Sequence, residues 1–260
     1  MIDGYAELQT VRLHYVEVGE GPLVVLLHGF PEFWYGWRHQ LEPLAAAGFR
    51  VVAPDLRGYN LSSKPVGRAA YRLDALAGDI RQLIEERGEA RACVAGHDWG
   101  GAVAWALAMA HPEVVRRLAI LNSPHPRRFK QAVLRPRQAA RSWYMGLFQL
   151  PWLPEFLGPR VFPFRDDPLY REAWAQPGAL TAMFNYYRAI TPRTRIAPVS
   201  APTLVIWGRH DAYLTLDVAE PPRSEVPNLD RVVVLNTSHW VQHEAPGEVT
   251  RLLADFFTLP

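Results

Sequence analysis

The chain has 260 residues, 49% of them apolar, which suffices for one substantial core or for a core with a small accessory domain. Its net charge of +2 and pI near 8.8 are too mild for a nucleic-acid-binding protein. The single cysteine, Cys93, excludes an internal disulfide, and no stretch is long and apolar enough for a membrane span. The N-terminus lacks a charged region followed by an apolar stretch, so we expect no signal peptide and a soluble cytoplasmic protein.

Short apolar runs alternate with helical patterns along most of the chain, which predicts an α/β fold with a mostly parallel central sheet flanked by helices. The expected antiparallel edge strand covers 13–18. The other expected strands cover 23–27, 50–53, 92–95, 118–121, 203–207 and 232–235. The expected helices cover about 37–47, 73–87, 101–111 and 247–257.

The stretch 129–196 differs in character from the rest. It holds 13 of the 30 aromatic residues and eight prolines, and it shows no clear strand. We interpret it as a helical cap that roofs a pocket, although the same aromatic side chains would also fill the insert's own small core. The predicted division is therefore an α/β core over 1–126 and 197–260, with a helical cap over 127–196.

The expected strand at 92–95 and helix at 101–111 are joined by Gly96-His97-Asp98-Trp99-Gly100-Gly101. Glycines on both sides of Asp98 allow a sharp turn that holds this side chain exposed, as in a nucleophile elbow, with aspartate where serine normally stands. A carboxylate is ionised at pH 7 and can displace a leaving group from saturated carbon, forming an ester with the protein. The alternative is an aspartate that caps a helix after a glycine-rich turn.

Three further loops follow expected strands. Leu26-Leu27-His28-Gly29-Phe30-Pro31 ends the strand before the first long helix, and in an elbow architecture the amides of Phe30 and Trp99 would form an oxyanion hole. Asp211 and His239 follow two later strands. Because the order nucleophile, acid, histidine is the one this architecture uses, we predict a triad of Asp98, Asp211 and His239 rather than turn or structural residues.

These motifs closely resemble the epoxide hydrolases of the α/β-hydrolase superfamily, from about Val11 to Phe257. The resemblance rests on the segments His28-Gly29-Phe30-Pro31, Asp55-Leu56-Arg57-Gly58, Gly96-His97-Asp98-Trp99-Gly100-Gly101 and Ser238-His239-Trp240, together with Asp211. The core motifs also fit haloalkane dehalogenases, which share the aspartate nucleophile.

The resemblance implies two cap tyrosines that hold the epoxide oxygen. One precedes the segment Phe148-Gln149-Leu150-Pro151 and is Tyr144; the other lies in Asn185-Tyr186-Tyr187-Arg188 and is Tyr187. Tyr170 and Tyr186 are the alternative candidates.

The implied reaction opens an apolar epoxide to a vicinal diol with water and needs neither a metal nor an organic cofactor. Asp98 would attack the ring, the two tyrosines would activate its oxygen, and His239, oriented by Asp211, would activate the water that hydrolyses the ester. The residues expected to contact the substrate are Phe30, Trp99, Trp143, Phe148, Tyr186 and Trp240.

Two rival functions stay open. In a dehalogenase, Trp99 and a cap tryptophan, Trp143 or Trp152, would hold the leaving halide; a non-catalytic protein would use the fold only to bind a ligand. The cluster of basic residues that enters the cap is interpreted as a solvated helix face; it comprises Arg127, Arg128, Lys130, Arg135, Arg137 and Arg141. No sequence feature specifies an oligomeric state.

Overall fold

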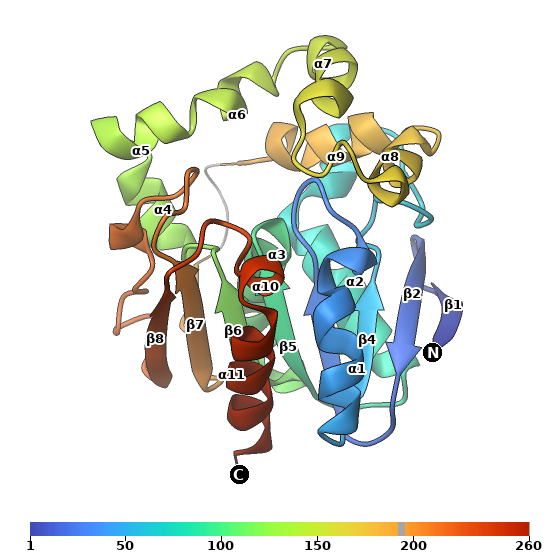
Figure 1. The fold of residues 1–260 in the computed structure, drawn as a ribbon, viewed down its shortest axis with the longest axis vertical. Coiled ribbons are helices and arrows are strands. Elements are labelled where there is room, and N and C mark those ends of the chain that lie inside the picture. The colour runs from blue at the N-terminus through green and yellow to red at the C-terminus, as the bar shows by residue number, and fades with distance from the viewer. Residues whose placement is uncertain (192–195, 260) are drawn as a thin grey trace.

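The computed structural model describes residues 1–191 and 196–259 (Figure 1). Residues 192–195, which belong to the predicted cap, lie outside the described residues. Within the described ranges, every helix is too short or too polar to cross a bilayer.

A single eight-stranded sheet forms the centre of the molecule, in the order β1-β2-β4-β3-β5-β6-β7-β8. All neighbouring strands from β4 onward are parallel, which confirms the predicted mostly parallel sheet. The strands are β1 (Ile2–Glu7), β2 (Arg12–Val18), β3 (Leu23–Leu27), β4 (Arg50–Pro54), β5 (Ala92–His97), β6 (Val115–Leu121), β7 (Thr203–Gly208) and β8 (Leu229–Leu235).

The predicted edge strand is wrong in one respect. β2 is antiparallel as expected, but it lies between β1 and β4, and β1 forms the edge. Of the six residues in β1, only Ala6 is buried. Because an exposed edge strand needs no apolar run, β1 gives no hydrophobic signal in the sequence.

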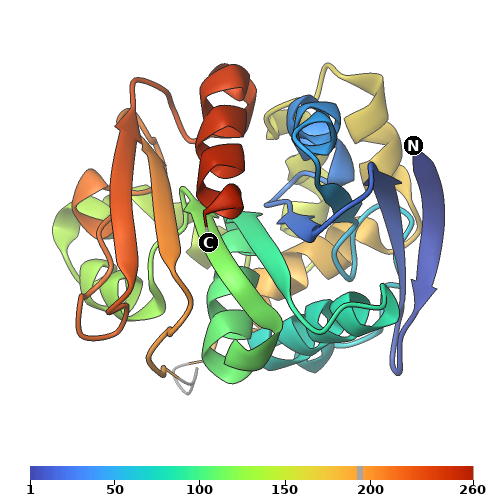
Figure 2. The ribbon, with the colours of Figure 1, turned by 90° about the horizontal axis from the view of Figure 1, so that it is seen from below.

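Helices cover both faces of the sheet (Figure 2). One face carries α1 (Arg38–Ala46) and α11 (Pro246–Thr258), the latter following the short α10 (Val241–Glu244), and the other carries α2 (Leu73–Glu86) and α3 (Trp99–Ala110). The central strands β3 and β5 are buried along their whole length, as expected for parallel strands packed on both sides. Short 3-10 helices cover Trp34–Trp37, Arg68–Tyr71, Pro112–Val114 and Leu216–Val218.

Six helices between β6 and β7 lie over the carboxyl ends of the strands (Figure 1). They are α4 (Pro126–Ala132), α5 (Pro136–Arg141), α6 (Trp143–Leu147), α7 (Leu153–Val161), α8 (Pro168–Ala175) and α9 (Ala179–Arg188). Proline opens α4, α5 and α8, where its missing N–H costs no helical hydrogen bond.

Buried hydrogen bonds join these helices to the loops beneath them. The Trp174 indole on α8 donates to the Pro31 carbonyl at 2.7 Å, and the Tyr186 hydroxyl on α9 donates to the Arg57 carbonyl at 2.7 Å. Both loops follow strands, β3 and β4 respectively. The inserted helices are therefore fixed above the edge where parallel strands deliver their loop residues.

Candidate active site

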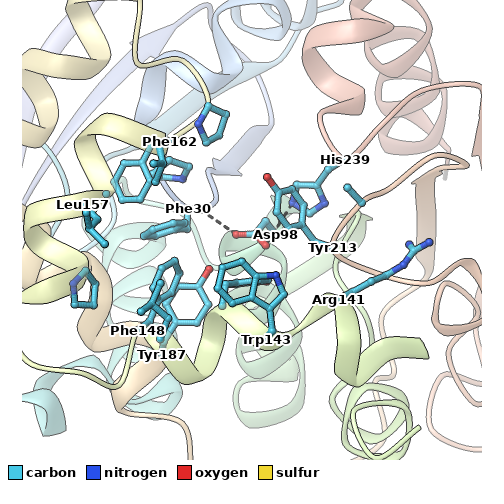
Figure 3. A pocket seen from close by; sticks show the side chains of 18 of the residues that line it. Phe30, Asp98, Arg141, Trp143, Phe148, Leu157, Phe162, Tyr187, Tyr213 and His239 are labelled. Carbon is cyan, nitrogen blue, oxygen red and sulfur yellow. Dashed lines mark hydrogen bonds and ion pairs between the residues drawn. The ribbon is translucent and has the colours of Figure 1, made fainter. Parts of the chain in front are cut away.

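Asp98 lies on a sharp turn between β5 and α3. Its φ of 50° and ψ of −117° are strained for a residue other than glycine. The flanking glycines are required by close approach: a Cβ on Gly96 would lie 2.4 Å from the Gly100 carbonyl oxygen, and one on Gly100 would lie 2.2 Å from that of Leu27. The turn leaves the Asp98 side chain 20% exposed, pointing into the space below the inserted helices (Figure 3).

Asp211 and His239 come from the loops after β7 and β8 and meet Asp98 at the same edge of the sheet. His239 Nδ1 lies 2.7 Å from Asp211 Oδ2, and His239 Nε2 lies 3.5 Å from Asp98 Oδ2. Both His239 and Asp211 are buried, whereas Asp98 is not. The structure thus brings together the three residues that the sequence singled out.

Asn122, directly after β6, was missed in the sequence. Its side-chain amide donates to Asp211 Oδ2 at 2.6 Å, while its carbonyl oxygen accepts from the Gly208 amide at 3.1 Å. Asp211 Oδ1 accepts from the amides of Tyr213 and Leu214 at 2.8 and 2.9 Å. The signal was available, because Asn122 follows its strand as Asp98 follows β5.

The triad is strongly coupled electrostatically. Burial by itself would lower the pKa of His239, but the carboxylates of Asp211 and Asp98 raise it to about 10. Burial would conversely raise the pKa of each carboxyl group, and the neighbouring His239 lowers both below their ordinary values. At neutral pH the resting site therefore holds a protonated imidazole between two carboxylates.

Two backbone amides lie at the nucleophile. The Phe30 amide donates to Asp98 Oδ1 at 2.9 Å. Trp99 is the first residue of α3, so its amide precedes the first intrahelical hydrogen bond and is free to serve a ligand. These are the two amides predicted from the sequence.

A cavity of about 600 Å³ opens above Asp98 and His239 (Figure 3). A second cavity of about 550 Å³ lies toward α4 and α9. Both are lined by Asp98, Tyr144 and Tyr187, so the nucleophile and the two predicted tyrosines stand where the cavities meet.

Tyr144 and Tyr187 come from α6 and α9, with ring centroids 6.0 Å apart. Burial raises the pKa of both hydroxyls well above the ordinary value, and the Asp98 carboxylate raises each further. Both phenols are therefore neutral at physiological pH and able to donate hydrogen bonds.

Other predicted contact residues are placed as follows. Phe30, Trp143, Phe148 and Trp240 line the first cavity, and Trp99 lines the second. Tyr213 also lines the first cavity, 5.0 Å from His239 between ring centroids, and was missed.

Tyr186 was wrongly predicted to contact the substrate. It is buried beneath α9, where its hydroxyl donates to the Arg57 carbonyl and its ring packs on Tyr59. Adjacent helical residues point about 100° apart, so Tyr187 faces the cavities while Tyr186 faces the core. Tyr170 is likewise occupied, because its hydroxyl donates to buried Glu32 at 2.9 Å.

A buried polar network supports His239 from behind. His97 Nε2 lies 2.9 Å from the His239 carbonyl oxygen, and His97 Nδ1 lies 3.4 Å from Glu32. Glu32 also accepts from Gln242 at 3.0 Å and lies 2.6 Å from His243 Nε2. His243 and His97 hold the pKa of Glu32 far below the ordinary value despite burial. His97 therefore fixes the backbone of the His239 loop.

The described part of the chain brings no group of three or more histidine, cysteine, aspartate or glutamate side chains into an arrangement suited to a metal ion.

Comparison with known proteins places this geometry in context. Residues 22–156 match the family model of the alpha/beta hydrolase fold. The chain is 44% identical to the AB hydrolase superfamily protein YfhM of Bacillus subtilis, over 97% of this chain and 96% of that protein. It is 38% identical to human epoxide hydrolase 4, over 95% of this chain and 75% of that protein.

Solved structures show the same relationship. The chain is similar to an epoxide hydrolase of Bacillus megaterium solved with an inhibitor, with a TM-score of 0.88 and 32% identity over 98% of this chain and all of that one. An epoxide hydrolase from Vigna radiata has a TM-score of 0.83 and 29% identity, over 98% of this chain and 97% of that one.

Proposed function

The chain belongs to the epoxide hydrolases of the α/β hydrolase superfamily, and on this premise we propose that it opens apolar epoxides to vicinal diols through a covalent ester of Asp98. The observation that carries the proposal is the placement of Asp98, Tyr144 and Tyr187 at the junction of the two cavities. There, a nucleophile and two neutral donors face one space.

The two oxygens of Asp98 have different surroundings. Oδ1 accepts from the Phe30 amide at 2.9 Å, whereas Oδ2 faces His239 Nε2 at 3.5 Å. Oδ2 would attack the ring carbon and become the ester oxygen, while Oδ1 would become the acyl oxygen. The Phe30 amide is therefore already bound to the atom that bears negative charge in the second step.

Ring opening would leave an alkoxide, which is a strong base. Tyr144 and Tyr187 would hydrogen-bond the epoxide oxygen opposite Asp98 and give it a proton as the C–O bond breaks. Their raised pKa values, caused chiefly by burial, keep them protonated until that moment. A positioned acid of this kind contributes about a hundredfold to ten-thousandfold in rate.

Formation of the Asp98 ester would also change the protonation state of His239. The ester carries no charge, so one of the two carboxylates that raise the pKa of His239 is removed and that pKa falls. The proton released by His239 would restore the phenol that protonated the alkoxide. His239 then becomes neutral and available as a base.

In the second step His239 would take a proton from water, and the resulting hydroxide would attack Cγ of Asp98. The Phe30 and Trp99 amides would stabilise the oxyanion, and collapse would release the diol. The alkoxide expelled in the collapse would take the proton of the newly formed Asp98 carboxylic acid and leave as the diol. Asp98 is then a carboxylate again, and His239 keeps the proton that it took from water, as in the resting site. Asp211, held by Asn122 and two amides, orients His239 throughout.

We further propose that residues 127–196 act as a cap domain that closes the site away from water, over a core of residues 1–126 and 197–260. The first cavity is walled mainly by aromatic and aliphatic side chains from α6, α7 and the loop between them, including Trp143, Phe148 and Leu157. Such walls favour an apolar substrate.

The positions of the two candidate tryptophans of the inserted helices do not favour the dehalogenase alternative. Among the described residues, Trp152 lines neither cavity, and Trp143 is 68% exposed at the outer wall of the first one. A non-catalytic binding role does not account for an intact triad with an oxyanion donor already bound to the nucleophile.

The decisive experiment is a single turnover in oxygen-18 water with enzyme in excess over styrene oxide. We expect the first diol to contain only unlabelled oxygen and the peptide with Asp98 to gain one heavy oxygen, because water attacks the acyl carbon. Heavy oxygen in the first diol, with Asp98 unlabelled, would instead mean direct attack of water on the epoxide.

A further inference from the structure

The outer surface of the inserted helices is unusually apolar. Of the 15 large apolar side chains that are exposed among the described residues, six fall within residues 134–161, about a ninth of the chain. They are Leu134, Trp143, Leu150, Trp152, Phe156 and Val161. Scattered exposed apolar residues need no explanation, but a concentration of this kind marks an interaction site. We name these six residues the apolar face.

Figure 1 shows where this segment lies. Helices α5, α6 and α7 run along the edge of the molecule farthest from the C-terminus. On α7, Phe156 points outward with 57% exposure, whereas Pro154 and Gly158 are buried. The helix is thus apolar on both sides, and only one side is covered by protein.

Charge is distributed just as unevenly. Residues 127–196 contain 12 basic and four acidic residues, a net charge of +8, whereas the other 190 residues contain 16 basic and 22 acidic, a net charge of −6. The net charge of the whole chain is therefore close to zero although its two parts carry large charges of opposite sign. Its cationic part is the part that carries the apolar face.

One cation lies directly beside an aromatic side chain of the apolar face. The Arg160 guanidinium stacks on the Phe156 ring, 4.1 Å from its centroid, and Arg137 is exposed on α5. The acidic residue of this segment, Glu155, is neutralised by Arg188 at 2.7 Å. Exposed aromatic and aliphatic side chains in a segment of net positive charge suit the headgroup region of a membrane that contains anionic lipids.

The mouth of the first cavity lies within the same face. Trp143 and Val161 both line the cavity and are 68% and 66% exposed, so they stand at its opening. A molecule held in contact with the apolar face would therefore lie beside the entrance to the nucleophile.

We propose that the apolar face docks on the surface of an anionic lipid bilayer and that epoxides dissolved in the membrane enter the first cavity directly. Since every described helix is too short or too polar to span a bilayer, the protein would lie on the membrane, held by side chains. The uptake of substrate rests on the proposed function, but docking does not.

The charge and the side chains of the apolar face favour a lipid bilayer over other binding partners. A second copy would bring two faces of the same sign together, which is unfavourable. Single-stranded nucleic acid would match the charge, but Leu134, Leu150 and Val161 offer no ring on which a base can stack. An anionic bilayer satisfies the charge and the aliphatic side chains together.

The test is cosedimentation with vesicles of phosphatidylglycerol and phosphatidylcholine, compared with phosphatidylcholine alone. We expect binding to the anionic vesicles that weakens as salt is raised, because each cation near such a surface multiplies partition about fivefold. The double variant Trp152→Ser/Phe156→Ser should bind at least about tenfold more weakly, because burying each aromatic side chain is worth about that factor.

The matched control is Ile2→Ser/Leu259→Ser, which removes two exposed apolar side chains, 57% and 44% exposed, far from the inserted helices. It should bind vesicles like the unaltered protein. Both double variants should hydrolyse a water-soluble epoxide at the unaltered rate, which shows that they are folded and active.

Equal binding by the two double variants would overturn the proposal. So would tighter binding to single-stranded DNA than to anionic vesicles, or a dimer that Trp152→Ser/Phe156→Ser dissociates while vesicles stay unbound. Failure of the proposed function would appear separately, as absence of turnover on the soluble epoxide with vesicle binding intact.

Discussion

Asn122 and His239 both bind the same oxygen of Asp211. The Asn122 amide reaches Asp211 Oδ2 at 2.6 Å and His239 Nδ1 reaches it at 2.7 Å, while Oδ1 is held by backbone amides. The carboxylate is therefore saturated with donors and cannot rotate. Through it, Asn122 sets the position of an imidazole that it does not touch.

We predict that Asn122→Ala lowers the rate of ester hydrolysis about tenfold, because a hydrogen bond to a charged group is worth about 1.5–3 kcal/mol. Loss of this donor also raises the pKa of Asp211, so the acid limb of the pH–rate profile should move to higher pH. The matched control is Asn60→Ala, because the Asn60 amide binds the buried Asp55 carboxylate at 2.8 Å.

Both asparagines have positive φ, 43° and 38°, so alanine imposes similar backbone strain at each. Asn60→Ala should lose stability without moving the acid limb. Identical pH profiles for the two variants would show that Asn122 is only structural.

His239→Gln should accumulate the ester. Without a base the second step stops, whereas attack by Asp98 still proceeds. Intact-protein mass spectrometry after exposure to styrene oxide should show the protein mass increased by one substrate molecule. The double variant Asp98→Asn/His239→Gln should show no adduct, and an unmodified His239→Gln protein would contradict the two-step route.

Tyr144→Phe/Tyr187→Phe should reduce kcat/KM for epoxides by at least about a hundredfold, because the leaving alkoxide loses its proton donors. Tyr186→Phe, beside Tyr187 on α9, is the control: it removes a hydroxyl that binds the Arg57 carbonyl. It should keep turnover while losing about 1 kcal/mol of stability. Steady-state kinetics and thermal melts distinguish the two, and full turnover by the double variant would refute the assignment of the cap tyrosines.

The stability of the protein should fall as pH rises from about 7 to 10. The pKa of His239 is 6.5 when unperturbed and about 10 in the fold, so between these values the native state binds more protons than the unfolded state. The stabilisation is complete below pH 6.5 and is lost as the pH passes through 10. Melting curves should show a steeper decline over this range for the unaltered protein than for His239→Gln.

The triad could be predicted because each member follows a strand, and parallel strands deliver such residues to one edge of the sheet. Asp98, Asp211 and His239 required only the order of strands and loops. The edge strand β1 could not be found, since an exposed strand has no apolar pattern.

The inserted helices were harder to interpret in detail. The resemblance to epoxide hydrolases implied Tyr144 and Tyr187, but Tyr186 was also expected to contact the substrate. The sequence alone does not show which face of α9 meets the core, because that depends on packing against Arg57 and Tyr59. The cluster of basic residues was interpreted as a solvated helix face because the sequence alone does not show which faces of these helices meet the rest of the protein.

The position of Asp98 where two chambers meet has a consequence for the size of molecule that can react. A long, straight epoxide need not fold back on itself, because the substituents on its two ring carbons can extend in opposite directions, one into each cavity. Epoxides with large substituents on both ring carbons are therefore compatible with this site, provided that each substituent fits the cavity that it enters.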